Sequence, residues 1–158
     1  MKYSGQANFS HQQQPKVGVL ITNLGTPEAP TPKALRKYLG QFLADPRVVE
    51  VPRIIWRCIL HGIILRIRPR RSAAAYQTVW TDEGSPLMTH TQNQCQALTQ
   101  QLKKRYGDDM IVAFAMRYGE PSVSTTIETM QKQGVRKLLV LPLYPQYSAA
   151  TTGSTFDA

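Results

Sequence analysis

The sequence predicts an α/β protein with a doubly wound parallel sheet, and three observations carry that prediction. Apolar runs of strand length at 17–23, 110–116 and 135–143 alternate with longer helical patterns. The chain between these runs is long enough for helical crossovers, which place the strands parallel. All three runs also end on polar residues. We therefore expect a Rossmann- or flavodoxin-type arrangement of three layers, and 158 residues are enough for one domain with a core.

The first predicted strand and helix have clear local signals. The run 17–23 is continuous and rich in β-branched residues, which is typical of a strand buried on both faces. Thr31 and Pro32 are an N-cap and a first helical residue, and apolar residues follow at helical spacing until Asp45 precedes a proline. A short extended piece is predicted at 48–51.

The segment 53–68 is very apolar, and all of its charges are basic. No acidic residue occurs between Glu50 and Asp82. Such a helix can be a core helix whose arginines extend to solvent, or a lip that touches lipid or an apolar anionic ligand. The residues alone leave both interpretations open.

The remaining helices are predicted from caps and glycines. We expect a helix from an N-cap at Ser72 through Trp80, then a loop, then a polar-faced helix that Gly107 closes. The last predicted helix runs from Ser122 to Gln133. The predicted helices, in order, therefore span 32–44, 53–68, 72–80, 89–106 and 122–133.

The stretch 137–154 contains the most informative strand end. Leu138–Leu143 has the composition of a buried strand, and it continues into tyrosines, hydroxyl residues and a glycine. Parallel strands would bring 23–25, 117–119 and 144–148 to one edge of the sheet, where ligands bind in open α/β folds. An ordinary polar loop after a strand is the plain alternative, but the convergence favours a ligand site.

The positive net charge of the chain limits the classes of partner that it is expected to bind. A net charge of +9 suggests a nucleic acid, a membrane surface or an acidic small molecule. Nucleic-acid binding is disfavoured because the arginines are concentrated in an apolar segment. Nucleotide binding is disfavoured because Gly25 stands alone in the first strand–helix turn, without the other glycines of a phosphate-binding loop.

The sequence offers no clustered metal ligands and little acid–base chemistry. His61 and His90 stand alone, and Cys58 and Cys95 are predicted to be reduced, buried thiols. The predicted strand ends carry Arg117 and tyrosines, but neither a carboxylate nor a histidine. The chain is therefore predicted to hold a binding half-site without a general acid or base.

Six motifs occur in order between Lys16 and the last residue: NLGTP at 23–27, DPRVVEVPR at 45–53, RIRPRR at 66–71, GSPL at 84–87, MRYGEPS at 116–122 and PLYPQYSAATTGS at 142–154. Together these motifs resemble the N-terminal half of ferrochelatase. The resemblance implies a class II chelatase-like fold of two similar α/β domains around a porphyrin cleft. Residues 16–158 would form one incomplete domain of it, after a disordered polar tail at 1–15. The implied reaction inserts Fe²⁺ into protoporphyrin IX to give haem.

The resemblance also assigns roles to five porphyrin-binding residues. Leu24 would lie against the macrocycle, and leucine at this position favours protoporphyrin over coproporphyrin. Arg68 would meet a propionate at the mouth, and Ser85 would hydrogen-bond a propionate. Arg117 and Tyr144 would line the inner pocket near the path of the iron.

Several expectations follow from where the sequence departs from the family pattern. Ala149 stands where some members have a cysteine ligand, so we expect no iron–sulfur cluster and no other permanently bound cofactor. In the family that the chain resembles, the catalytic histidine and its partner glutamate lie in the C-terminal half of the protein. We therefore expect no catalytic and no metal-binding residue in this chain. The partners implied are protoporphyrin IX and a C-terminal half.

Two further interpretations stay open beside the enzyme. One is a catalytically inactive half-protein that binds porphyrin or haem, and the other is a generic anion-binding α/β domain. We expect a cytoplasmic protein with peripheral membrane contact through 53–68, the segment that resembles the apolar lip of the family. The TTGS sequence at 151–154 is expected to begin a further helix.

Overall fold

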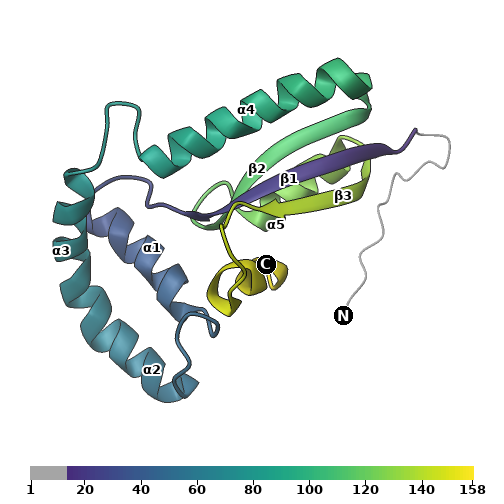
Figure 1. Ribbon diagram of the computed structural model, residues 1–158. Coiled ribbons are helices and arrows are strands. Elements are labelled where there is room, and N and C mark those ends of the chain that lie inside the picture. Colours follow the sequence, from purple (N-terminus) through teal and green to yellow (C-terminus); the bar gives the residue numbers. More distant parts are fainter. Residues whose placement is uncertain (1–13) are drawn as a thin grey trace.

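The computed structural model describes residues 14–158, which contain a parallel sheet in the order β2-β1-β3 (Figure 1). The predicted tail at 1–15 lies outside the described residues, apart from Gln14 and Pro15. The central strand is buried over five consecutive residues, as its continuous apolar run predicted. The strands are β1 (Lys16–Gly25), β2 (Met110–Tyr118) and β3 (Val135–Pro142).

Helices α4 (Pro86–Tyr106) and α5 (Val123–Lys132) cover opposite faces of the sheet (Figure 1). Side chains alternate along a strand, so Val19 and Leu20 of β1 point to opposite faces. Val19 lines a hollow with residues of α4, whereas Leu20 belongs to the α5 core. This confirms the predicted three-layer, doubly wound arrangement. The buried α5 core consists of Leu20, Ala115, Val123, Met130 and Val135.

A second group of helices packs at the carboxyl ends of the strands. Thr31 caps α1 (Pro32–Ala44) by accepting a hydrogen bond from the backbone of Ala34, as its position before Pro32 predicted. A second buried cluster joins α1 to α3 and to the end of β2. The other members of the group are α2 (Arg53–Ile59), the π-helical turn η1 (Leu60–Ile64) and α3 (Leu65–Gln77).

The prediction of a new helix at Ser72 was wrong, because α3 passes through this residue without a break. Pro69 lies inside α3, yet Leu65, Pro69 and Ala73 are all buried, at a spacing of four residues. This stripe packs against α1, and the packing keeps the helix intact across a proline that would end an isolated one. We call α2, η1 and α3 together the arm.

Several other boundaries differ from the sequence predictions. The extended piece expected at 48–51 begins as a turn, in which the N–H groups of Val48 and Val49 each donate to the carbonyl of Asp45 over 3.1 Å. Helix α4 starts at Pro86 rather than 89, and β2 continues to Tyr118. A short turn, η2 (Gly107–Asp109), precedes β2. The helix expected at the TTGS sequence is confirmed as η3 (Ala149–Gly153) and α6 (Ser154–Phe156).

The expected burial of β3 is not observed. Leu139 is 58 % exposed and Leu141 is 45 % exposed, because β3 is an edge strand and α4 packs against β1 and β2. The apolar run predicted the strand correctly but not its position in the sheet. Cys58 is likewise exposed on α2, contrary to the predicted buried thiol, whereas Cys95 is buried as predicted.

Candidate functional site

The carboxyl ends of the strands bring three of the predicted site residues together. Leu24 lies between two residues of β1 that pair with residues 116 and 118, so it neighbours Arg117. The backbone N–H of Leu143 donates to the carbonyl of Thr22 over 2.8 Å, which places Tyr144 beside the end of β1. We call this edge the rim. The predicted convergence of strand ends is therefore confirmed.

Ser85 also reaches the rim, at the start of α4. Its hydroxyl is buried and accepts a hydrogen bond of 2.8 Å from Thr26, just beyond the end of β1. One turn and a half further along α4, Thr91 accepts a 3.1 Å hydrogen bond from Asn23. These two hydrogen bonds hold the first turns of α4 against the end of β1. Because the Ser85 hydroxyl acts as an acceptor here, its own proton is available to donate to another group.

Arg117 sits in a polar network rather than in open solvent. Its Nε donates to Ser154 Oγ over 2.6 Å, and its Nη2 donates to Asp45 Oδ2 over 2.8 Å. The same carboxylate oxygen accepts from Tyr118 at 2.8 Å and from Ser154 at 2.6 Å. The guanidinium also lies over the Tyr118 ring, 4.9 Å from its centroid. We call Asp45, Arg117, Tyr118 and Ser154 the Asp45 network.

The network sets the ionisation of its members. Burial alone would raise the pKa of Asp45, but hydrogen bonds from Ser154, the backbone of Arg47 and Tyr118, together with the charge of Arg117, hold that pKa below its usual range. Burial raises the pKa of Tyr118 to about 12. Asp45 is therefore a carboxylate and Tyr118 a neutral phenol at neutral pH.

Tyr144 is half-buried, and its hydroxyl makes no hydrogen bond of good geometry among residues 14–158, although Thr155 lies close enough to lower its pKa slightly. Burial raises the pKa of this tyrosine, so the hydroxyl is a neutral donor. Buried polar groups in proteins are nearly always paired. An unpaired hydroxyl at the rim is therefore consistent with a ligand site.

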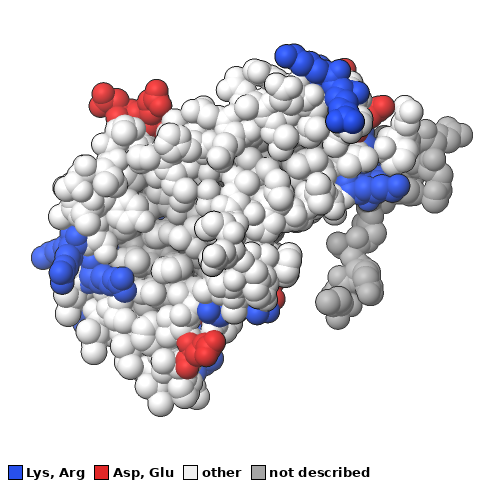
Figure 2. All heavy atoms as spheres, viewed as in Figure 1, with Lys and Arg blue, Asp and Glu red and all other residues white. Residues whose placement is uncertain are grey.

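Arg68 lies apart from the other predicted residues, on the exposed side of α3. It lines an open hollow of about 620 Å³ together with Ile63, Ile67 and Arg71. Figure 2 shows lysine or arginine side chains over the part of the view where Figure 1 places α3, bordered by uncharged surface. The arm thus offers apolar surface and cationic groups side by side.

The arm exposes much of its apolar surface while it anchors the rest. Leu60 and Leu65 are buried in the cluster with α1, whereas Ile54, Ile63 and Ile67 are 82 %, 56 % and 69 % exposed. The core interpretation of segment 53–68 therefore describes the side that packs on α1, and the lip interpretation describes the exposed side. No helix within residues 14–158 is long and apolar enough to cross a bilayer.

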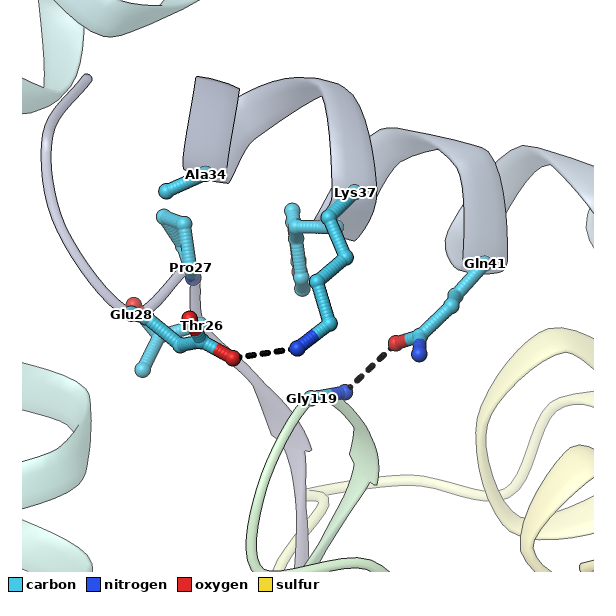
Figure 3. A pocket seen from close by; sticks show the side chains of 8 residues that line it. Thr26, Pro27, Glu28, Ala34, Lys37, Gln41 and Gly119 are labelled. Carbon is cyan, nitrogen blue, oxygen red and sulfur yellow. Dashed lines mark hydrogen bonds and ion pairs between the residues drawn. The ribbon is translucent and has the colours of Figure 1, made fainter. Parts of the chain in front are cut away.

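A small hollow behind the rim is filled by internal contacts (Figure 3). Glu28 forms an ion pair with Lys37, and Gln41 Oε1 accepts a 2.9 Å hydrogen bond from the N–H of Gly119. The remaining space, about 10 Å³, is room for about one water molecule. These contacts fasten α1 to the ends of β1 and β2 and leave no space for a ligand.

Sequence reasoning missed the Asp45 network. The sequence predictions place Asp45 only at the end of a helix and Ser154 only in a hydroxyl-rich run, although the two residues lie within the motifs at 45–53 and 142–154. Among residues 14–158 there is no group of three or more His, Cys, Asp or Glu side chains suited to a metal ion.

The fold and the rim define a class: an open, doubly wound α/β domain whose strands end together at one edge, the place where ligands bind in such folds. The family model described as Ferrochelatase matches residues 16–158, and the chain belongs to the ferrochelatase family.

Curated relatives agree with this assignment. The chain is 66 % identical to the ferrochelatase of Idiomarina loihiensis and 62 % identical to that of Marinobacter nauticus, in each case over 158 residues. A third relative, the ferrochelatase of Pseudoalteromonas atlantica, is 62 % identical over the same length. Each comparison covers the whole of this chain, but it covers only 43 %, 43 % and 44 % of the lengths of the three relatives, respectively. The chain therefore spans less than half the length of these proteins.

Proposed function

We propose that this chain supplies the N-terminal half of the porphyrin pocket of a ferrochelatase, which inserts Fe²⁺ into protoporphyrin IX to give haem. The observation that carries the proposal is the rim, where Leu24, Arg117 and Tyr144 meet at neighbouring strand ends in a member of this family. Iron is a substrate in this proposal, and no residue of the chain is assigned as a base or as a metal ligand.

The environment of each side chain supports the contact that we propose for it. Leu24 packs at the edge of the buried cluster and offers an apolar surface to the macrocycle. Tyr144 has an unpaired hydroxyl, and Ser85 keeps a proton to donate to a propionate. Arg68 is exposed beside apolar side chains, which suits a ligand that is apolar in the ring and anionic at its edge.

Replacing Arg68 with alanine should weaken the binding of protoporphyrin IX about tenfold, because a guanidinium–carboxylate pair is lost. Titration of the chain with protoporphyrin IX, followed by the Soret band, measures the dissociation constant. The dimethyl ester has no carboxylate, so its binding should be unaffected by Arg68→Ala. Arg66→Ala is the matched control, since Arg66 lies on α3 but does not line the hollow.

Two results would contradict this proposal at different points. Equal losses for the free acid and the diester would remove the propionate role of Arg68. A Soret band that stays unchanged with excess wild-type chain would overturn porphyrin binding itself.

We further propose that the arm contacts the membrane surface at the periphery, on its cytoplasmic side. Ile54 and Ile67 present apolar surface, and the exposed Arg57 and Arg70 lie on the same arm. An apolar face with arginines beside it is the pattern of helices that lie in the membrane interface. A porphyrin is itself an apolar substrate, so such contact would bring the site to it.

The double substitution Ile54→Ser/Ile67→Ser should lower binding to phosphatidylglycerol vesicles by about tenfold, because two apolar side chains no longer enter the interface. Vesicle sedimentation measures the bound fraction, and pure phosphatidylcholine vesicles should bind the wild-type chain more weakly. Val79→Ser is the matched control, because Val79 is 56 % exposed but lies beyond α3. Retention of wild-type binding by the double variant would refute the membrane role of the arm.

A further inference from the structure

The carboxylate of Asp45 is the common acceptor of a buried network that joins distant parts of the chain. Asp45 follows α1, Arg117 lies near the end of β2, and Ser154 begins α6. The two hydrogen bonds from these residues to Asp45 span 72 and 109 positions of sequence. One acidic side chain thus connects the end of a helix, the end of a strand and the segment after β3.

This network restrains the orientation of Arg117. Two of its N–H groups donate to Ser154 and Asp45, and its guanidinium rests on the Tyr118 ring. Two hydrogen bonds and a ring contact together leave the planar guanidinium little freedom to rotate. A side chain that is already held loses less entropy when a ligand binds, which favours affinity.

The restrained guanidinium still has donors to offer. Arginine carries five N–H donors, and the network uses one on Nε and one on Nη2. No hydrogen bond joins Nη1 of Arg117 to another residue within 14–158. The neighbours of Arg117 across the sheet and beyond its strand end are Leu24 and, further along the rim, Tyr144.

We propose that Asp45 and Ser154 are positioning residues, which hold the guanidinium of Arg117 at the rim so that its remaining N–H groups face the ligand. The inference rests on the proposed function, since the ligand concerned is the porphyrin. Asp45 and Ser154 act through Arg117 and do not themselves touch the macrocycle. Their loss therefore affects porphyrin binding only as far as it releases Arg117.

The test compares Asp45→Asn and Ser154→Ala with the wild-type chain by two readouts. The first, without porphyrin, is the NMR signal of the Arg117 Nε–H group, which should exchange slowly in the wild-type chain and rapidly in both variants. The second is the Soret titration, in which Asp45→Asn should weaken the binding of protoporphyrin IX about tenfold. Ser154→Thr keeps the hydroxyl and should preserve both readouts.

A double-mutant cycle separates positioning from a general loss of structure. Asp45→Asn combined with Arg117→Ala should bind no more weakly than Arg117→Ala alone, because the effect of Asp45 passes through Arg117. Glu28→Gln is the matched control: it also breaks a carboxylate–cation pair beside α1, but an exposed one, and should change neither readout.

The outcomes are distinguishable. A slowly exchanging Arg117 signal in Asp45→Asn, or additive losses in the cycle, would overturn the positioning role. An unchanged Soret band with the wild-type chain would overturn the proposed function instead. In that case the Nε–H signal, which needs no porphyrin, still decides whether Asp45 holds Arg117.

Discussion

Replacing Gly25 with alanine should unfold most of the chain, with a loss of about 4 kcal/mol or more in the free energy of unfolding. Gly25 ends β1 at a φ of 107°, and a Cβ built there would lie 1.8 Å from the carbonyl oxygen of Tyr118. That oxygen belongs to backbone at the end of β2, so no side-chain rotation relieves the clash. Strands β1 and β2 would have to separate at the rim.

The matched control for this prediction is Gly84→Ala. Gly84 has a similar φ of 102°, but a Cβ there would meet nothing within 4 Å. Its replacement should therefore cost only the backbone strain, about 1–3 kcal/mol. Urea denaturation followed by far-UV circular dichroism measures both variants. Equal urea midpoints for the two variants would show that β1 and β2 leave room for a Cβ at Gly25, contrary to the structure.

Replacing Asp45 with alanine should lower the free energy of unfolding by about 3 kcal/mol at pH 7, because it leaves a partly buried guanidinium without its counter-charge. The side chain of Asp45 is 4 % exposed and that of Arg117 is 20 % exposed, so water screens this pair only in part. The hydroxyls of Tyr118 and Ser154 lose their acceptor as well. Chemical denaturation at pH 7 measures the loss.

The effect of Asp45 should also depend on pH in a defined direction. The pKa of Asp45 is lower in the folded chain than its usual value of 3.8, so its contribution is complete above that value and is lost as pH falls through the folded pKa. The stability difference between wild type and Asp45→Asn should therefore shrink between pH 7 and pH 3. Asp108→Asn, which removes an exposed partner of Lys103, should show little difference at either pH. A difference for Asp45→Asn that is constant with pH would contradict the assignment of a carboxylate.

Local signals predicted the elements whose ends depend on neighbouring residues. Thr31 and Pro32 predicted the start of α1, and Ser122 predicted the start of α5, because a cap hydrogen bond acts over three residues. The continuous apolar run of β1 predicted a strand that is buried on both faces. Polar residues after each strand predicted the rim, because parallel strands end at one edge.

Other features depended on packing that no local pattern encodes. The arm continues through Ser72 because the buried stripe of Leu65, Pro69 and Ala73 rests on α1. Leu139 is exposed because α4 packs against β1 and β2 rather than β3, and the order of strands along the chain does not determine this packing.

The sequence by itself determined the fold class, the family and the strand ends that meet at the rim. Those properties rest on short-range periodicity and on motifs that are read residue by residue. Only the tertiary structure decided that Arg117 is held by Asp45 and Ser154, which lie 72 and 37 positions away from it. Hydrogen bonds over such separations form only after the helix end, the strand end and the segment after β3 have packed together, and a buried carboxylate is stable there only because it is paired.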